Sequence, residues 1–145
     1  MGRIVVAYLV AVIVTHILAS LFHTQFILAE LTGMGVAVDW ATRVQASLDD
    51  FIGLTASVVF PAIIAIGLLI AFVAAGFVAR LAPGLRWFVF FVAGAVAMAV
   101  IFMLLKQALG TVGLFGARGT LGLAAQCLAG AVGGLVFATL KPAVR

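Results

Sequence analysis

The sequence has very few charged residues, and this scarcity excludes the soluble classes of protein. Charged side chains make up 8% of its 145 residues, whereas apolar side chains make up 67% and the mean hydropathy is +1.42. A soluble domain carries about 25% charged and roughly 45–50% apolar residues. The chain has too little polar surface to cover a globule in water. The sequence therefore predicts an integral membrane protein whose principal partner is the lipid bilayer.

Several chemical motifs are also absent. Cys127 is the only cysteine, which excludes an intrachain disulfide and a CxxC site, and asparagine does not occur. There is no Walker A loop, zincin motif, or kinase or deaminase signature. The net charge of +4 comes from scattered basic residues, no two of them adjacent, whereas a nucleic-acid surface requires them to cluster. We therefore expect no nucleic-acid partner, no cofactor and no metal site, and an enzyme is a less favoured class.

Four apolar stretches are long enough to cross a membrane, which takes about 20 residues. They cover residues 4–22, 51–78, 87–105 and 121–140. No alternation of period two persists as a transmembrane barrel would require. The expected fold class is all-α, a single four-helix membrane domain over residues 1–145. The first stretch also has features of a signal peptide ending near Ser20, but it lacks a clean A-x-A site and its apolar pattern continues further, which favours a retained span.

The basic residues indicate how the spans are oriented, because cytoplasmic loops carry an excess of Lys and Arg. If the N-terminus is inside, five basic residues fall on the inner side and three on the outer side, namely Arg3, Arg80, Arg86, Lys141 and Arg145 against Arg43, Lys106 and Arg118. This bias predicts an N-in, C-in topology. We expect the membrane to be a bacterial inner (plasma) membrane.

All the acidic residues lie in one connection, residues 23–50, between the first two spans. Helical spacing continues to about Leu31, where a Gly-Met-Gly run breaks it. Asp39 is then a good N-cap for a second helix. The segment is expected to form a helical hairpin on the outer side, either projecting into water or lying flat at the interface. Its acidic residues are Glu30, Asp39, Asp49 and Asp50.

His16 is the one ionisable residue clearly inside a span, and such groups usually face a bundle interior or water. His23 and Glu30 follow at intervals of seven, so the three side chains fall on nearly one side of a helix. This stripe is a candidate proton or cation path, since histidine changes charge near neutral pH. The alternative is a neutral His16 bonded to a neighbouring helix, with His23 and Glu30 solvated at the interface.

Two polar residues of other spans are expected at the depth of His16. Counting the helical rise from the span ends brings Ser57 and Gln126 close to that level, so we predict a polar pocket in the outer leaflet between spans one, two and four. Pro61 is expected to bend the second span and free the Ser57 carbonyl as a ligand for an ion or water. A kink whose carbonyl is satisfied by neighbours is the alternative. Nearby in depth are Thr15, Thr55 and Cys127.

Small residues provide the expected helix contacts. Gly130 and Gly134 form a GxxxG motif on the fourth span, which permits close approach of helices in lipid, either within one chain or between copies. Because four thin spans leave little room for an internal pathway, we expect a homo-oligomer. The glycines within residues 107–120 indicate a flexible loop or, alternatively, a re-entrant segment.

Three functions are compatible with these features. The polar stripe, the expected kink and the acidic hairpin favour a channel or transporter-like protein. The small-residue faces alone suit a structural or accessory subunit of a larger complex, with another membrane protein as partner. A membrane enzyme acting on lipid headgroups ranks third, because the chain offers no activated nucleophile. Its two histidines also lie about 10 Å apart along one helix, too far to share a metal.

Overall fold

The computed structural model describes residues 2–109 and 119–141, and within these residues the chain is helical with no strands. The elements, in order, are α1 Gly2–Gly33, α2 Trp40–Ala56, α3 Val59–Leu81, the 3₁₀ turn η1 Pro83–Leu85, α4 Arg86–Leu109 and α5 Thr120–Leu140. Four of them, α1, α3, α4 and α5, are long and apolar enough to cross a membrane. The expected all-α class is confirmed, and the chain is an integral membrane protein.

Part of the sequence argument lies outside the described residues. Most of the glycine-rich segment 107–120 does so, and so do Arg118 and Arg145, which entered the count of basic residues.

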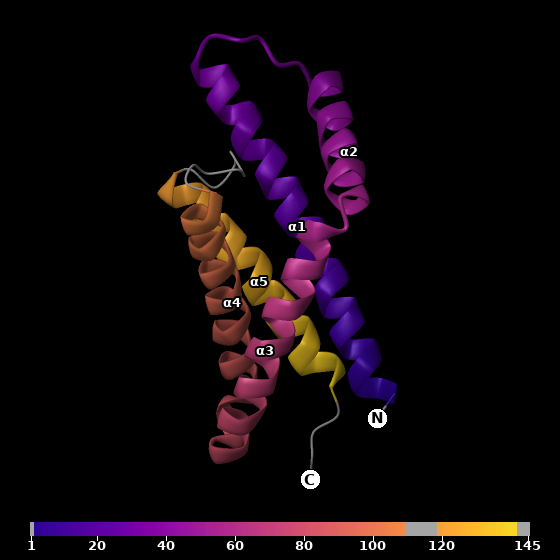
Figure 1. Cartoon of the computed structure of the whole chain (residues 1–145), viewed down its shortest axis with the longest axis vertical. Coiled ribbons are helices and arrows are strands. Elements are labelled where there is room, and N and C mark those ends of the chain that lie inside the picture. The colour runs from indigo at the N-terminus through magenta and orange to yellow at the C-terminus, as the bar shows by residue number, and fades with distance from the viewer. Residues whose placement is uncertain (1, 110–118, 142–145) are drawn as a thin grey trace.

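The longest helix, α1, extends past the other spans. Its 32 residues correspond to about 48 Å, more than the roughly 30 Å of a hydrocarbon core. In Figure 1 its upper part rises above α4 and α5, and α2 lies beside this extension. The start of α1 and the end of α5 lie together at the opposite, lower end (Figure 1). We call the end with the 34–39 turn the hairpin end and the other the terminal end.

The turn into α2 uses one glycine and one side-chain cap. Gly35 has a φ of +87°, a left-handed conformation that glycine adopts without steric cost. Asp39 then accepts a hydrogen bond from the Thr42 N–H at 2.9 Å, which satisfies a free donor in the first turn of α2. Hydrogen bonds from Thr42 hold the pKa of the Asp39 carboxyl below its usual value. The expected N-cap is confirmed.

The expectation of one continuous second span over residues 51–78, bent at Pro61, is wrong. One helix stops at Ala56 and another starts at Val59, with Val58 between them at a φ of +56°. Pro61 is the third residue of α3. Backbone N–H groups in a first turn have no helical partner to lose, so a proline there begins a helix without kinking it.

The Ser57 carbonyl is also used differently from the expectation. It accepts the Val59 N–H at 2.5 Å, and the Ser57 hydroxyl donates to the Leu54 carbonyl at 2.8 Å. Both polar groups of Ser57 thus close the turn between α2 and α3. The prediction that Pro61 frees this carbonyl for an ion is therefore wrong.

Glycines bring α4 and α5 into close contact. A Cβ atom added to Gly130 would overlap the Gly94 carbonyl, and one added to Gly94 would overlap the Gly130 carbonyl. A Cβ on Gly134 would overlap the Phe90 carbonyl. These side-chain-free positions let the two backbones touch, the contact that substitutes for a hydrophobic driving force in lipid. The small-residue face of α5 is therefore occupied by α4 of the same chain.

Three phenylalanines fill the space between α3, α4 and α5 toward the terminal end. Phe72 and Phe137 stack with ring centroids 4.5 Å apart, and Phe90 meets both edge-on at 5.9 and 5.1 Å. All three are buried. We call them the aromatic block, and the buried Ala7 and Ala11 of α1 join the same core.

Candidate functional site

One face of α1 is lined by buried polar side chains. They recur at spacings of one, three and four, which places them on one side of the helix, and each is between 0 and 8% exposed. Polar groups buried in a span are costly and mark functional sites. We call these residues the α1 polar face: Thr15, His16, Ser20, His23 and Thr24.

His16 lies against the last turn of α2 and the first turn of α3. Its Nε2 is 2.9 Å from the Thr55 hydroxyl, and its ring lies between those of Phe51 and Phe60, at centroid distances of 5.7 and 5.8 Å. The α2–α3 break therefore packs directly over this histidine. In Figure 1 the break lies beside α1, at about the height of the upper ends of α4 and α5.

The bonding of Thr55 favours one tautomer of the neutral His16 ring. The Thr55 hydroxyl donates to the Phe51 carbonyl at 2.6 Å, so its single proton is used there. Nε2 of His16 must then donate to the Thr55 oxygen, and in the neutral ring the lone pair lies on Nδ1. Nδ1 is buried and has no partner among the described residues. His16 thus presents a free proton acceptor inside the protein.

Asp50 lies at the hairpin-end side of the α1 polar face. The Thr24 hydroxyl donates to its carboxylate at 2.9 Å and lies 3.1 Å from the Ser20 carbonyl. A charge-assisted bond of this kind is stronger than a neutral one. A negative charge is therefore held on α2 beside the upper part of the polar face.

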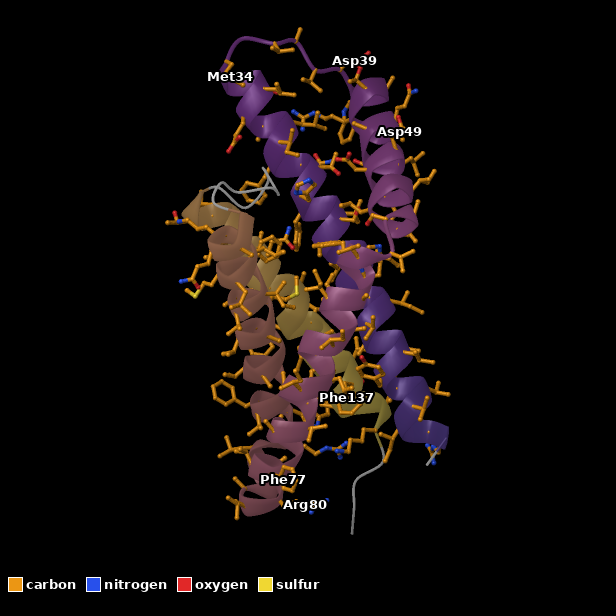
Figure 2. The ribbon with its side chains drawn as sticks, in the orientation of Figure 1. Met34, Asp39, Asp49, Phe77, Arg80 and Phe137 are labelled. Atoms are coloured by element: carbon orange, nitrogen blue, oxygen red, sulfur yellow. The ribbon has the colours of Figure 1, made fainter. Side chains whose placement is uncertain are left out.

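A second set of bonds joins α1 and α2 closer to their turn. Gln25 Nε2 donates to the Ser47 hydroxyl at 3.1 Å, and Arg43 Nη1 donates to Gln25 Oε1 at 3.3 Å. These groups are exposed. The two helices are thus held together by polar contacts at the hairpin end, where Figure 2 shows Asp39 and Asp49 as well.

Gln126 connects α5 to this face. Its side chain is completely buried, and its Nε2 donates to the Ala19 carbonyl of α1 at 3.0 Å. Its Oε1 accepts nothing from the described residues. Thr15 also packs on α5, because a Cβ atom added to Gly133 would overlap its hydroxyl oxygen. Helix α5 therefore covers the lower part of the polar face.

Within the described residues, the buried polar atoms without a hydrogen-bond partner gather here. They are Thr15 Oγ1, His16 Nδ1, Ser20 Oγ, His23 Nδ1 and Gln126 Oε1. Each buried polar group left unpaired costs about 1–3 kcal/mol. Four of these atoms belong to α1, and the fifth is on the Gln126 side chain, which contacts α1. The free-energy cost of unpaired polar atoms is therefore concentrated along the α1 polar face.

Toward the terminal end the polar face gives way to apolar packing. Below Thr15 the buried positions of α1 are Ala11 and Ala7, and the aromatic block occupies the neighbouring core. The unpaired polar atoms therefore end near the middle of the bundle.

The structure brings together some of the predicted site residues and separates others. His16, His23 and Gln126 are buried around α1. Ser57 and Glu30 are exposed, as are Asp39 and Asp49, whereas Asp50 is partly buried against α1. Thr55, in the last turn of α2, occupies the position beside His16 that Ser57 was expected to fill.

Sequence reasoning missed Ser20 and Thr24. Both lie four residues apart on the same helical side as the histidines, and this spacing was available as a signal. Isolated hydroxyl residues in an apolar span give little warning, however, because they also bond to their own backbone. The described residues bring no three His, Cys, Asp or Glu side chains together in a way that could hold a metal.

Comparison with known proteins finds no match among models of protein families, curated proteins or solved structures.

Proposed function

We propose that this chain is a transporter-like membrane protein in which protons reach His16 from the hairpin end along the α1 polar face. The observation that carries the proposal is the line of five unpaired, buried polar atoms from His23 to Gln126. A bundle that needed only to pack would gain stability by replacing them with apolar groups. Water and protons moving along this face would supply the missing partners.

Each end of this route has suitable chemistry. The Asp50 carboxylate attracts cations at its start, and the Nδ1 lone pair of His16 accepts a proton further in. In this proposal the aromatic block is the barrier toward the terminal end, and passage across the whole membrane requires its rings to part. In the state described the atoms of this route are buried, so entry from the hairpin end requires α1 and α2 to separate at the polar face.

The proposal includes an orientation and an assembly. The described basic residues Arg3, Arg80, Arg86 and Lys141 lie near the helix ends at the terminal end, which supports an N-in, C-in topology in a bacterial inner membrane. The polar face then belongs to the outer leaflet. A homo-oligomer would give each thin bundle a partner surface, and large apolar side chains are exposed on every span.

Proton flux into vesicles tests the proposal. Purified protein is reconstituted around a pH-sensitive dye, and a pH difference is imposed. The wild-type chain is expected to dissipate the difference. His16→Ala is expected to reduce the rate to that of protein-free vesicles, because His16 is the deeper of the two histidines on α1 and the route ends at its Nδ1. Ile17→Ala is the matched control, since Ile17 is the adjacent residue of the same helix and is 38% exposed.

Two results would contradict this function. One is wild-type protein that conducts no faster than empty vesicles, and the other is His16→Ala protein that conducts as fast as the wild type. Thermal unfolding of each variant in detergent verifies that a lost rate reflects a lost group in a folded protein.

An accessory role is the second candidate, and α2 favours it. This helix has no buried residue, and its apolar side chains repeat every four residues with exposures of 54–80%, at Trp40, Val44, Leu48 and Ile52. Such a stripe suits a partner helix or the membrane surface. A stoichiometric membrane-protein partner that is lost from Leu48→Ser and kept by Gln45→Ser would support this role. A stable homo-oligomer that purifies alone from both variants would contradict it.

A further inference from the structure

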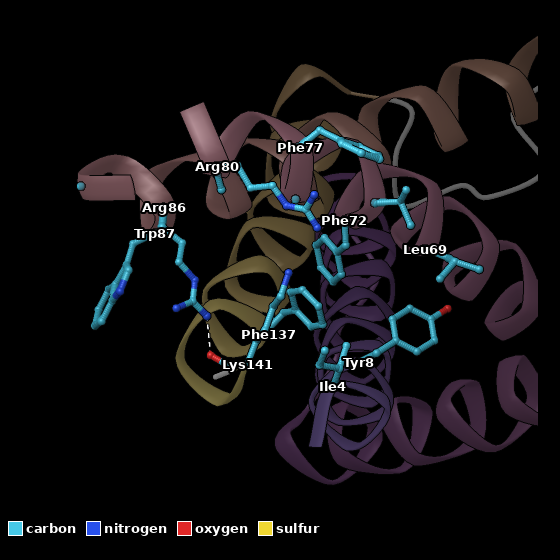
Figure 3. A pocket seen from close by; sticks show the side chains of 14 residues that line it. Ile4, Tyr8, Leu69, Phe72, Phe77, Arg80, Arg86, Trp87, Phe137 and Lys141 are labelled. Atoms are coloured by element: carbon cyan, nitrogen blue, oxygen red, sulfur yellow. Dashed lines mark hydrogen bonds between the residues drawn. The ribbon is translucent and has the colours of Figure 1, made fainter. Parts of the chain in front are cut away.

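A cavity at the terminal end, away from the α1 polar face, combines aromatic walls with a group of cations. Its volume is about 860 Å³, within the roughly 300–1,000 Å³ typical of ligand pockets. Helices α1 and α3 form its sides and α5 its floor (Figure 3). The apolar lining includes Ile4, Tyr8, Leu69, Phe72, Phe77 and Phe137, and the cations are Arg80, Arg86 and Lys141.

The cavity exists because α1 and α3 separate toward this end. The Tyr8 hydroxyl donates to the Ala65 carbonyl of α3 at 2.5 Å, which joins the two helices just above the opening. Below this bond Ile4 and Leu69 are 40 and 50% exposed and line the cavity from opposite helices. The gap between the spans is therefore open on the side where lipid chains would lie.

Among the described residues, no carboxylate lies beside these cations. All four acidic side chains of the sequence lie within residues 30–50, at the hairpin end, and none of them lines this cavity. Arg86 donates through Nη2 to the Ala138 carbonyl at 2.9 Å and to the Lys141 carbonyl, which caps the end of α5 and fixes the guanidinium there. Three positive charges are thus held together without a neutralising side chain.

The described residues around Lys141 carry no negative charge. Its Nζ lies 5.1 Å from the Phe90 ring centroid and 5.4 Å from that of Phe137, over aromatic faces and not in open water. Burial lowers the pKa of Lys141, and repulsion from Arg86 and Arg80 lowers it further. An anion among these three groups would remove the repulsion.

We propose that this cavity binds an anionic phospholipid, with its phosphate between Arg80, Arg86 and Lys141 and an acyl chain in the opening between α1 and α3. The cations match a phosphate, to which guanidinium groups donate paired hydrogen bonds. The aromatic and aliphatic walls match a hydrocarbon chain. Their positions also agree, because the cations lie at the helix ends, where headgroups meet a span, and the apolar walls lie deeper.

Trp87 provides a local reporter of this site. It lines the cavity, and the only other tryptophan, Trp40, begins α2 at the opposite end of the molecule. Trp40→Phe protein therefore has a single tryptophan, beside the proposed lipid. This protein is reconstituted into phosphatidylcholine vesicles in two series. One series contains increasing fractions of brominated phosphatidylglycerol, and the other contains increasing fractions of brominated phosphatidylcholine. Bromine atoms on the acyl chains quench the fluorescence of a nearby indole ring.

Brominated phosphatidylglycerol is expected to quench Trp87 at a lower fraction than brominated phosphatidylcholine. Arg80→Gln is expected to reduce this preference about fivefold, the effect of one interfacial cation, and Arg80→Gln with Lys141→Gln to abolish it. Arg80 is exposed, so its replacement leaves the core intact. Lys106→Gln is the matched control, since it removes one exposed cation from the other end of α4.

Equal quenching by the two lipids, or a preference that survives the double substitution, would overturn the proposal. Inorganic phosphate added to the vesicles distinguishes a lipid from a free anion. The lipid assignment predicts unchanged quenching, because the acyl chain contributes to binding. Displacement of the brominated phosphatidylglycerol by phosphate alone would contradict it.

Discussion

Gln126 illustrates, at the scale of single residues, how stability and the proposed function oppose each other. It is fully buried with one of its two polar atoms unpaired. Gln126→Leu keeps a similar volume. It removes the unpaired oxygen, which costs about 1–3 kcal/mol, and also the Nε2 bond to the Ala19 carbonyl, which contributes about 0.5–1.5 kcal/mol, so the free energy of unfolding is expected to rise by about 1 kcal/mol. The same change is expected to slow proton flux. Unfolding in detergent and vesicle flux measure the two effects.

Gln107→Leu is the control for this exchange, because Gln107 is exposed near the end of α4. It should change neither quantity. Loss of stability in Gln126→Leu would show that the side chain is a structural bond and not a member of a proton route.

Val58 stores backbone strain at the α2–α3 break. Its φ of +56° is unfavourable for a β-branched residue, at a cost of about 1–3 kcal/mol. Val58→Gly relieves the strain but adds about 0.5–1 kcal/mol of entropy cost, so we expect a net gain in unfolding free energy of about 1 kcal/mol. Val59→Gly, at the first residue of α3, relieves no positive φ and is expected to lose about 0.5–1 kcal/mol through the same entropy cost.

Thermal or denaturant unfolding of the two variants separates these effects. If Val58→Gly destabilises the protein as much as Val59→Gly does, the left-handed conformation is not strained. Thr55, which contacts His16, lies just before this break. Val58→Gly therefore also tests whether the backbone conformation at the break fixes the position of the His16 ring.

The candidate site was partly predictable residue by residue. A histidine in an apolar span is conspicuous by its cost, so His16 and His23 could be recognised from sequence alone. The exposure of Glu30 could not be predicted in the same way. A seven-residue interval places it on the same side of the helix as the histidines, but it does not show whether another helix covers that position. Thr55, and not the expected Ser57, lies beside His16. The expectation came from depth along a continuous span, and depth does not show where the helix ends.

At the scale of helices, the glycine contacts between α4 and α5 determine how closely the bundle packs. Gly130→Ala is expected to reduce the free energy of unfolding by about 1–3 kcal/mol, because the new methyl group meets the Gly94 carbonyl and the helices must separate. Gly53→Ala in α2 is the control. A Cβ there meets nothing within 4 Å, so it should gain up to about 1 kcal/mol from helix propensity.

A Gly130→Ala protein as stable as the wild type would show that the α4–α5 contact is not tight. If the variant instead changed its oligomeric state without losing stability, Gly130 would belong to an interface between copies.

The helices themselves were largely predictable, but one boundary was not. Apolar length identified four candidate spans, and Asp39 marked the start of α2 through its capping side chain. The break at Val58 was indicated only by Pro61, which can begin a helix as well as bend one, and the apolar composition continues through the break. Contacts of α2 and α3 with His16 are tertiary, and a run of apolar residues does not report them.

At the scale of the whole molecule, charge is separated along the long axis. The acidic residues lie at the hairpin end around Asp50, and three cations surround a cavity at the terminal end (Figure 2). Between them are an unpaired polar face and an aromatic block. The central claim is that protons reach this buried polar face from the hairpin side alone.

Nitrogen-15 spectra of histidine-labelled protein in vesicles test that claim most directly, because the chain has only two histidines. His23→Gln identifies the His16 ring signal. Met34→Cys in a Cys127→Ser background, labelled by an impermeant thiol reagent, reports which side carries the hairpin end. We predict that the His16 signal shifts when the pH is lowered on the hairpin side and stays fixed when it is lowered on the terminal side. A ring that responds to neither side, or to the terminal side, would contradict the account.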